Sequence, residues 1–403
     1  MKIIEGGVCA AKGFSANGIH CGIRKNKDKR DVALIVSEKR AAAAAVYTQN
    51  LVKGAPLAVT KKHLEDGYAQ AVICNSGNAN TCNANGEQVA EEMGEIAAGA
   101  LGISANDVIV GSTGVIGMVL DPKPIRDGMS ELAAGLGNNS ELACEAIMTT
   151  DTKIKQAAIS FDIDGTECRM GCISKGSGMI HPNMATMLIF ITTDCAISPE
   201  MLQKALSEDV RHSFNMISVD GDTSTNDMVT VLANGMAGND EIVSEGPEFD
   251  AFCEAMRAVT VPVCRMIAKD GEGATKLLEC IVTGGKSEKD AKTIAKAVVC
   301  SSLTKAAMFG ADANWGRVLC AIGYSGADVD ITKVDVDFES AKGRIAVCRD
   351  GAGVEFSEEK AKEILLEDEI KILIALGDGD DTATAWGCDL TYEYVHINGD
   401  YRT

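Results

Sequence analysis

The sequence predicts a mixed α/β protein in which helices cover layered sheets. Its 403 residues are 46% hydrophobic and 24% charged, so the chain can bury a sizeable core and is not disordered. Short apolar runs bounded by Gly, Asn or Asp indicate buried strands, and helical stretches lie between them. Strands and helices therefore mix along the whole chain, which is typical of α/β and α+β proteins. No change in composition is sharp enough to mark a domain boundary.

The expected strands can be placed in chain order. Six are continuous apolar runs, at residues 71–74, 108–110, 187–193, 228–232, 277–282 and 370–376. Residues 334–338 (Val-Asp-Val-Asp-Phe) alternate with period two, which predicts a half-solvated strand.

The expected helices lie between these runs. Residues 87–101 are rich in Ala and Glu, residues 201–212 follow a Ser-Pro start, and Ser287 can cap a helix with one apolar face. Residues 238–250 are acidic and contain Gly, so they predict a surface loop.

Charge and cysteine content limit the partners and the compartment. The 38 basic and 58 acidic residues give a net charge of −20, which repels phosphate backbones and anionic lipid, so we expect no nucleic-acid or membrane partner. The N-terminus lacks an apolar signal region, and no run approaches the length of a membrane span. The 15 cysteines are odd in number and contain no CxxC, so we expect reduced, mostly buried thiols in the cytoplasm. The five histidines contain no HExxH, and no metal site is expected.

Two glycine-rich segments suggest ligand loops. Residues 283–287 (TGGKS) resemble the end of a P-loop, but Cys280 occupies the position that requires glycine, so this route to nucleotide binding is not expected. Residues 111–117 (GSTGVIG) follow an expected strand without the GxGxxG spacing. Such a turn can direct backbone N–H groups and the Thr113 hydroxyl toward one point, as an oxyanion site requires, or it can simply end a strand.

One segment can carry covalent chemistry. Residues 175–186 (KGSGMIHPNMAT) lead through Ala185 into Thr186, immediately before an expected buried strand. If the Ala185–Thr186 bond were cut, Thr186 would hold a hydroxyl nucleophile and a free α-amine that can act as its base. The residues alone fit equally well a loop that enters a core strand.

A family resemblance favours the first alternative. Residues 175–193 (KGSGMIHPNMATMLIFITT) closely resemble the self-processing segment of the arginine-biosynthesis ornithine acetyltransferases, also called glutamate N-acetyltransferases. Further segments that resemble this family follow the expected order along nearly the whole chain, at residues 74–80, 112–117, 148–152, 270–276, 310–316 and 396–403. The resemblance implies the family's α/β fold of layered sheets and helices.

The resemblance also implies a mechanism. The precursor would cleave itself between Ala185 and Thr186 into an α chain, 1–185, and a β chain, 186–403, which usually assemble as α₂β₂. Thr186 would take the acetyl group of N2-acetylornithine, release ornithine and pass the acetyl group to L-glutamate by a ping-pong route. No cofactor is implied. Some members also use acetyl-CoA as the donor, and no residue of this sequence indicates which type it is.

The family's site residues can be carried over by motif. Thr113 and Gly114 would stabilise the oxyanion, Lys175 would bind a substrate carboxylate, and Glu272 would bind the ornithine ammonium group. A hydroxyl contact is expected from Thr149 or Thr150, and C-terminal contacts are expected from Asn398 and Thr403. Without the resemblance, Lys175 and Glu272 would read as ordinary surface charges. His181 is expected to shape the cleavage loop, since the α-amine of Thr186 is the better candidate for the base.

Two rival functions remain. An aminopeptidase or amidase would keep the N-terminal threonine but use water as the acyl acceptor, and it would release acetate without transfer to glutamate. A non-catalytic binding protein would retain the fold and show no transfer.

Overall fold

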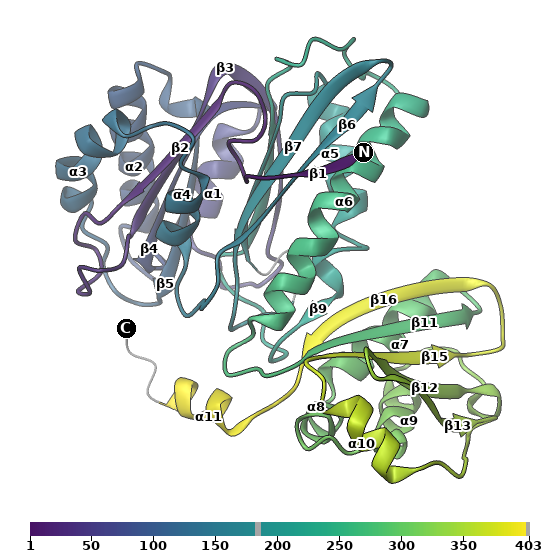
Figure 1. Cartoon of the computed structure of the whole chain (residues 1–403). Coiled ribbons are helices and arrows are strands. Elements are labelled where there is room, and N and C mark those ends of the chain that lie inside the picture. Colours follow the sequence, from purple (N-terminus) through teal and green to yellow (C-terminus); the bar gives the residue numbers. More distant parts are fainter. Residues whose placement is uncertain (182–186, 400–403) are drawn as a thin grey trace.

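The computed structural model describes residues 1–181 and 187–399, and its two β-sheets with flanking helices confirm the expected mixed α/β fold (Figure 1). Strands of the first sheet follow the order β1-β6-β7-β8-β10-β3-β4-β5, and β2 also pairs with β3. Their bounds are β1 (Lys2–Ile4), β2 (Phe14–Ile19), β3 (Val32–Tyr47), β4 (Tyr68–Asn78), β5 (Val108–Val115), β6 (Lys155–Ile163), β7 (Thr166–Lys175), β8 (Leu188–Thr193) and β10 (Met228–Ala233).

The second sheet is built from the C-terminal half of the chain. Its strand order is β14-β13-β12-β15-β11-β16-β9. The bounds are β9 (Ile217–Ser218), β11 (Leu277–Gly285), β12 (Asp335–Ser340), β13 (Gly343–Arg349), β14 (Ala352–Gly353), β15 (Glu369–Ala375) and β16 (Asp381–Cys388).

The long strand β3 divides the first sheet into two facing halves. Its pairing with β4 shifts register between Val36 and Ala41; before the shift β3 also pairs with β2, and after it with β10. Side chains alternate across β3, so Leu34 joins one apolar cluster while Ile35 joins a second cluster shared with Phe190 of β8. That second cluster is the core between the halves.

Helices close the outer faces of both halves, which gives the order helix, sheet, sheet, helix across the upper part of Figure 1. On the β2–β5 side lie α1 (Ala55–His63), α2 (Gly86–Leu101) and α3 (Lys123–Ala134), and α4 (Ser140–Ile147) packs at the central core. On the β6–β8 side lie α5 (Pro199–Asp209) and α6 (Pro247–Lys269).

Helix α6 also joins the two sheets, because it contacts β11 and β16 of the second sheet, and one large apolar cluster runs through both. The remaining helices are α7 (Glu288–Cys300), α8 (Ser302–Phe309), α9 (Trp315–Tyr324), α10 (Glu358–Leu365) and α11 (Tyr392–Gly399), with short 3₁₀ turns η1 (Ala105–Asp107), η2 (Phe214–Met216) and η3 (Ile331–Lys333). In the described part of the chain, no helix combines the length and the apolarity needed to cross a bilayer.

The seven expected strands and three expected helices are confirmed, and the differences have physical reasons. The loop expected over residues 238–250 ends earlier, because α6 begins at Pro247, a residue suited to the first turn of a helix. The helix expected to reach residue 212 ends at Asp209. The expectation of a half-solvated strand is wrong at Asp337, which is 4% exposed because Arg344 and Arg349 pair with its carboxylate.

All fifteen cysteines lie among the described residues and are free thiols, and nine of them are buried. Burial raises the pKa of most of these buried thiols, for example that of Cys144 to about 11, and a protonated buried thiol is unreactive. This agrees with the expectation of reduced thiols that serve as small apolar core residues.

Candidate active site

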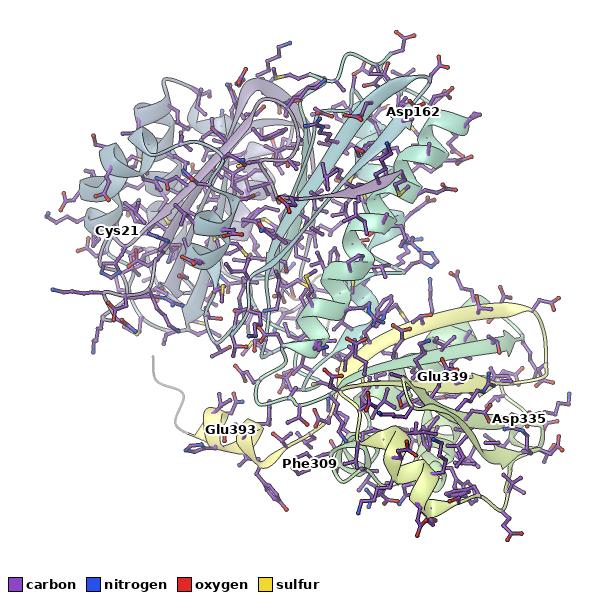
Figure 2. All side chains as sticks on the ribbon, in the orientation of Figure 1. Cys21, Asp162, Phe309, Asp335, Glu339 and Glu393 are labelled. Atoms are coloured by element: carbon purple, nitrogen blue, oxygen red, sulfur yellow. The ribbon has the colours of Figure 1, made fainter. Side chains whose placement is uncertain are left out.

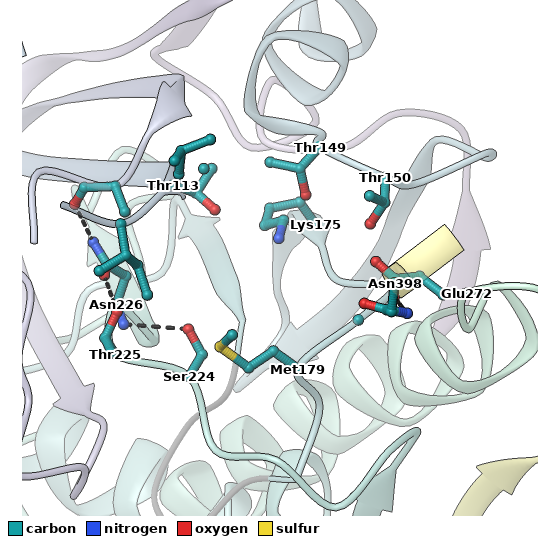
Figure 3. Close-up of a pocket in the computed structure, with 15 residues that line it drawn as sticks. Thr113, Thr149, Thr150, Lys175, Met179, Ser224, Thr225, Asn226, Glu272 and Asn398 are labelled. Carbon is teal, nitrogen blue, oxygen red and sulfur yellow. Dashed lines mark hydrogen bonds between the residues drawn. The ribbon is translucent and has the colours of Figure 1, made fainter. Parts of the chain in front are cut away.

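A cavity of about 260 Å³ lies where the first sheet, the loop before β11 and helix α11 meet (Figure 3). Seven of the residues expected in the site line it: Thr113, Gly114, Thr149, Thr150, Lys175, Glu272 and Asn398. These seven residues come from five segments that are far apart in the sequence, so only the fold brings them together. The expected cleavage pair, Ala185 and Thr186, and the expected contact Thr403 lie outside the described residues.

The described start of β8 lies beside this cavity. Strand β10 runs parallel to β8 with Met228 opposite Leu188, and the Met228 N–H donates to the Met187 carbonyl at 2.8 Å. Asn226, two residues before β10, lines the cavity. The chain segment directly after Thr186 is therefore fixed next to the cavity wall.

Thr113 and Gly114 lie within the last three residues of β5, where the pairing with β4 becomes irregular, and we call this irregular end of the strand the Thr113–Gly114 turn. Gly114 has φ +131°, and a Cβ at this position would lie 2.4 Å from the Gly77 carbonyl carbon, so only glycine fits here. Thr113 is 8% exposed and its hydroxyl faces the cavity in Figure 3. The turn thus presents a hydroxyl and a peptide unit at one place, which is the pairing that an oxyanion site requires.

Asn226 fixes this turn, and the sequence analysis missed it. Its side-chain amide donates to the Ser112 carbonyl at 3.0 Å and to the Ala79 carbonyl at 2.6 Å, while its oxygen accepts from the Thr81 and Thr225 hydroxyls. Buried side-chain amides with every polar atom bonded hold backbone segments in one arrangement. The available signal was a polar run, residues 224–227, directly before a buried strand.

Lys175 and Glu272 place opposite charges on the cavity wall. Lys175 ends β7 and is 9% exposed, and Glu272 is 8% exposed. A Cβ at position 178 would lie 2.3 Å from the Glu272 carboxylate carbon, so any larger residue there would displace this carboxylate. The Asn398 side-chain amide donates to the Glu272 carboxylate at 2.7 Å. A ligand that carries both an anionic and a cationic group can therefore pair with both charges on the cavity wall.

A buried ion-pair network positions three of these segments. The Lys155 ammonium group lies 2.7 Å from the Asp151 carboxylate and 2.5 Å from that of Asp270. Asp151 also accepts the backbone N–H groups of Thr149 at 3.0 Å and Gly176 at 2.7 Å, so it ties the threonine segment to the residue after Lys175. Asp270 in turn stands two residues before Glu272 in the sequence.

Within this network, Asp151 and Lys155 stabilise each other's ionised form. Burial alone would raise the pKa of Asp151, but Lys155 and then Lys175 outweigh it, and its pKa lies below the usual range. Burial would lower the pKa of Lys155, but Asp151 and Asp270 outweigh it and raise that pKa. Asp151 therefore stabilises the fold above its unfolded pKa of about 3.9, and this contribution is lost as the pH falls through the lower folded pKa.

Lys155→Met is expected to destabilise the protein by about 3–5 kcal/mol, because it removes the ammonium group that pairs with two buried carboxylates. Urea unfolding followed by circular dichroism at pH 7 measures the change in midpoint. The matched control is Lys153→Met, an exposed position two residues away, which is expected to change stability by less than about 0.5 kcal/mol. Equal midpoints for both variants would contradict the role of this network.

Comparison with known proteins covers nearly the whole chain. A model described as the ArgJ family matches residues 15–403. The chain belongs to the ArgJ family. This confirms the resemblance drawn from the sequence segments.

Two relatives in the ArgJ family match from end to end. The arginine biosynthesis bifunctional protein ArgJ of Caldanaerobacter subterraneus subsp. tengcongensis is 48% identical over 405 residues, which cover 100% of both chains. The protein of the same name from Symbiobacterium thermophilum is 50% identical over 406 residues, again 100% of both. A crystal structure of arginine biosynthesis bifunctional protein argJ from Bacillus halodurans matches with a TM-score of 0.50 and 46% identity, and covers 52% of this chain and 97% of the solved one.

The segments that resemble the ArgJ family do not all meet at the cavity. Of residues 74–80 only Ala79 lines the cavity, and Asn75 instead packs behind the Thr113–Gly114 turn, where its side chain accepts from the Ser112 hydroxyl at 2.6 Å. Residues 310–316 line none of the cavity, and Asn314 instead caps α9 by accepting the Arg317 N–H at 3.3 Å. That segment serves the fold of the second sheet.

His181 does not line the cavity either. Its Nδ1 atom lies 3.2 Å from the Ser218 hydroxyl and 3.4 Å from the Cys300 thiol. Burial, aided by Lys296, lowers the pKa of His181 to about 4, which makes it a weak base at neutral pH. These contacts are consistent with the expected structural role. Among the described residues, no cluster of three or more His, Cys, Asp or Glu side chains is arranged to hold a metal ion.

Proposed function

We propose that this chain is a self-processing acetyltransferase of arginine biosynthesis that transfers the acetyl group of N2-acetylornithine to L-glutamate. The observation that carries the proposal is the cavity itself, whose wall combines the opposite charges of Lys175 and Glu272 with the Thr113–Gly114 turn. N2-Acetylornithine carries a carboxylate, an ammonium group and an acetyl carbonyl, and each has a complementary group here. Full-length identities of 48% and 50% to bifunctional ArgJ proteins support the same function.

The first step is self-cleavage. The Thr186 hydroxyl oxygen attacks the Ala185 carbonyl carbon, the peptide C–N bond breaks, and water then hydrolyses the resulting ester. The products are an α chain, 1–185, and a β chain, 186–403, whose new N-terminal amine acts as the base. The solved chain from Bacillus halodurans is about half as long as this one, which supports a protein that exists as two pieces.

Transfer follows by two half-reactions on Thr186. The hydroxyl oxygen bonds to the acetyl carbon of N2-acetylornithine, and ornithine leaves after its nitrogen takes the hydroxyl proton. The α-amine of glutamate then attacks the acetyl ester, and the threonine oxygen takes back a proton. Thr113 and Gly114 stabilise the negative oxygen that forms in both halves.

Substrate contacts complete the proposal. Lys175 binds the α-carboxylate, and Glu272, supported by Asn398, binds the ornithine ammonium group. Thr149 and Thr150 both line the cavity and supply hydroxyl hydrogen bonds, and Thr403 is proposed as a further contact. We place the enzyme in the cytoplasm as an α₂β₂ assembly, with acetyl-CoA as a second acetyl donor.

Incubation with N2-acetylornithine and L-glutamate tests the function. The expected products are ornithine and N-acetylglutamate in equal amounts. Acetate in place of N-acetylglutamate would instead indicate the amidase reaction, and no turnover would overturn the proposal.

Glu272→Gln is expected to raise the KM for N2-acetylornithine roughly 10-fold or more, because a charge-assisted contact to the ammonium group is lost. Self-cleavage, which does not involve the ornithine side chain, is expected to continue at the wild-type rate. Steady-state kinetics and denaturing gels measure the two effects. Glu254→Gln, on the exposed side of α6, is the matched control and leaves both values unchanged. Unchanged kinetics in Glu272→Gln would place this residue outside the site.

A further inference from the structure

A second cavity, of about 420 Å³, adjoins the first. Both are lined by Gly114, Val115 and Thr149, so the end of β5 and the threonine segment separate them. The rest of its wall comes from the loop between β2 and β3, with Gly77 and Met118. Ligand pockets fall in this size range.

The β2–β3 loop is held against the oxyanion turn by defined contacts. The fully buried Asp31 carboxylate accepts the backbone N–H groups of Cys21 at 2.7 Å, Gly22 at 3.1 Å and Arg24 at 3.0 Å. The Arg24 guanidinium donates to the Met148 carbonyl at 2.6 Å. Its side chain also lies against Gly77, where a Cβ would come within 2.8 Å of it. These contacts hold the β2–β3 loop against Gly77, which in turn contacts Gly114.

This loop carries the opposite charge from the rest of the molecule. Residues 24–30 (RKNKDKR) contain five basic residues and one acidic residue, in a chain of net charge −20. Lys25 and Lys29 line the cavity and are exposed, and no carboxylate of the described residues lies within 4 Å of either ammonium group. Figure 2 shows Cys21, at the start of the loop, far from the acidic side chains Asp335 and Glu339. A local positive field of this kind attracts a polyanion.

The rim between the two cavities is apolar and exposed. Ile116 is 40% exposed, Met118 53% and Val119 69%. Ile116 lines the first cavity and Met118 the second. Neighbouring apolar side chains exposed between two cavities fit a ligand that has an uncharged arm.

We propose that this second cavity binds the acyl donor acetyl-CoA, with its phosphates at Lys25 and Lys29 and its pantetheine arm along Met118 and Val115. The proposal rests on the acetyltransferase function above and identifies the second donor's site. The arm passes the Gly114 turn, so the thioester carbonyl reaches the oxyanion site. The Thr186 oxygen bonds to the acetyl carbon, the C–S bond breaks, and the hydroxyl proton passes through the α-amine to the sulfur, which leaves as the CoA thiol.

The test is the double variant Lys25→Gln/Lys29→Gln in the full, processed protein. Its KM for acetyl-CoA is expected to rise roughly 10-fold relative to its KM for N2-acetylornithine, because charge-assisted phosphate contacts are lost. Acetyl-pantetheine, which lacks the nucleotide, is expected to react equally with wild type and variant. Lys27→Gln, in the same loop but outside the cavity lining, is the matched control and keeps the wild-type ratio. Calorimetric titration with CoA measures the same loss without turnover.

These measurements distinguish a failure of the second-site proposal from a failure of the proposed acetyltransferase function. Equal CoA affinity in wild type and the double variant, or a wild type that transfers from N2-acetylornithine but does not bind CoA, overturns the second-site proposal alone. A wild type that binds CoA through these lysines but transfers no acetyl group from N2-acetylornithine supports the second site and overturns the proposed function.

Discussion

Thr186→Ala is expected to leave one uncut chain of about 42.2 kDa with no acetyl transfer. The substitution removes the only hydroxyl that can attack the Ala185 carbonyl from the next residue. It also prevents release of the α-amine that serves as the base. Both self-cleavage and catalysis are therefore lost together, which a residue needed for only one of them would not cause.

Denaturing mass spectrometry and a transfer assay measure these two effects. Thr186→Ser is the matched control, because it keeps the hydroxyl and the potential α-amine and is expected to be cut and active. A cut and active Thr186→Ala protein would refute the assignment of the nucleophile.

Thr113→Val is expected to lower kcat by roughly 10²–10³-fold while the KM values change little, because a donor to the developing oxyanion is lost. Valine has nearly the shape of threonine, and Thr113 stands on a turn that Asn226 and the Gly77–Gly114 contact hold in place. The backbone is therefore expected to stay as it is. Thr113→Ser keeps the hydroxyl and is expected to restore most of the rate.

Initial rates with both substrates varied give kcat and KM for the three proteins. Wild-type kcat in Thr113→Val would remove this hydroxyl from the oxyanion site. A loss in Thr113→Ser as large as in Thr113→Val would contradict the assignment to the hydroxyl, because serine keeps that group.

Much of the fold and of the site could be predicted because short stretches of the sequence indicate them on their own. Apolar runs such as Val108–Val110 indicate buried strands from the local sequence, and the segments around Thr113, Lys175 and Glu272 have recognisable family patterns. Strand β3 was missed because the exposed residues at its bend break its apolar pattern into two parts. Hairpin β6–β7 mixes polar residues with apolar ones and gives a weak signal.

The supporting residues could not be predicted because their partners are distant in sequence. Asn226 bonds Ser112, 114 positions away, and Lys155 pairs with Asp270, 115 positions away. A single sequence contains no pattern that shows which of its distant positions will contact each other. The second cavity was hidden for the same reason, because only the fold brings Lys25 and Lys29 to the same cavity wall as Gly114.

The intact mass of freshly purified wild-type protein under denaturing conditions tests self-processing most directly. We expect two polypeptides, one beginning at Thr186, whose masses add up to the precursor plus one water. A single chain of 42.2 kDa that stays uncut on incubation would contradict the nucleophile, the base and the transfer mechanism together.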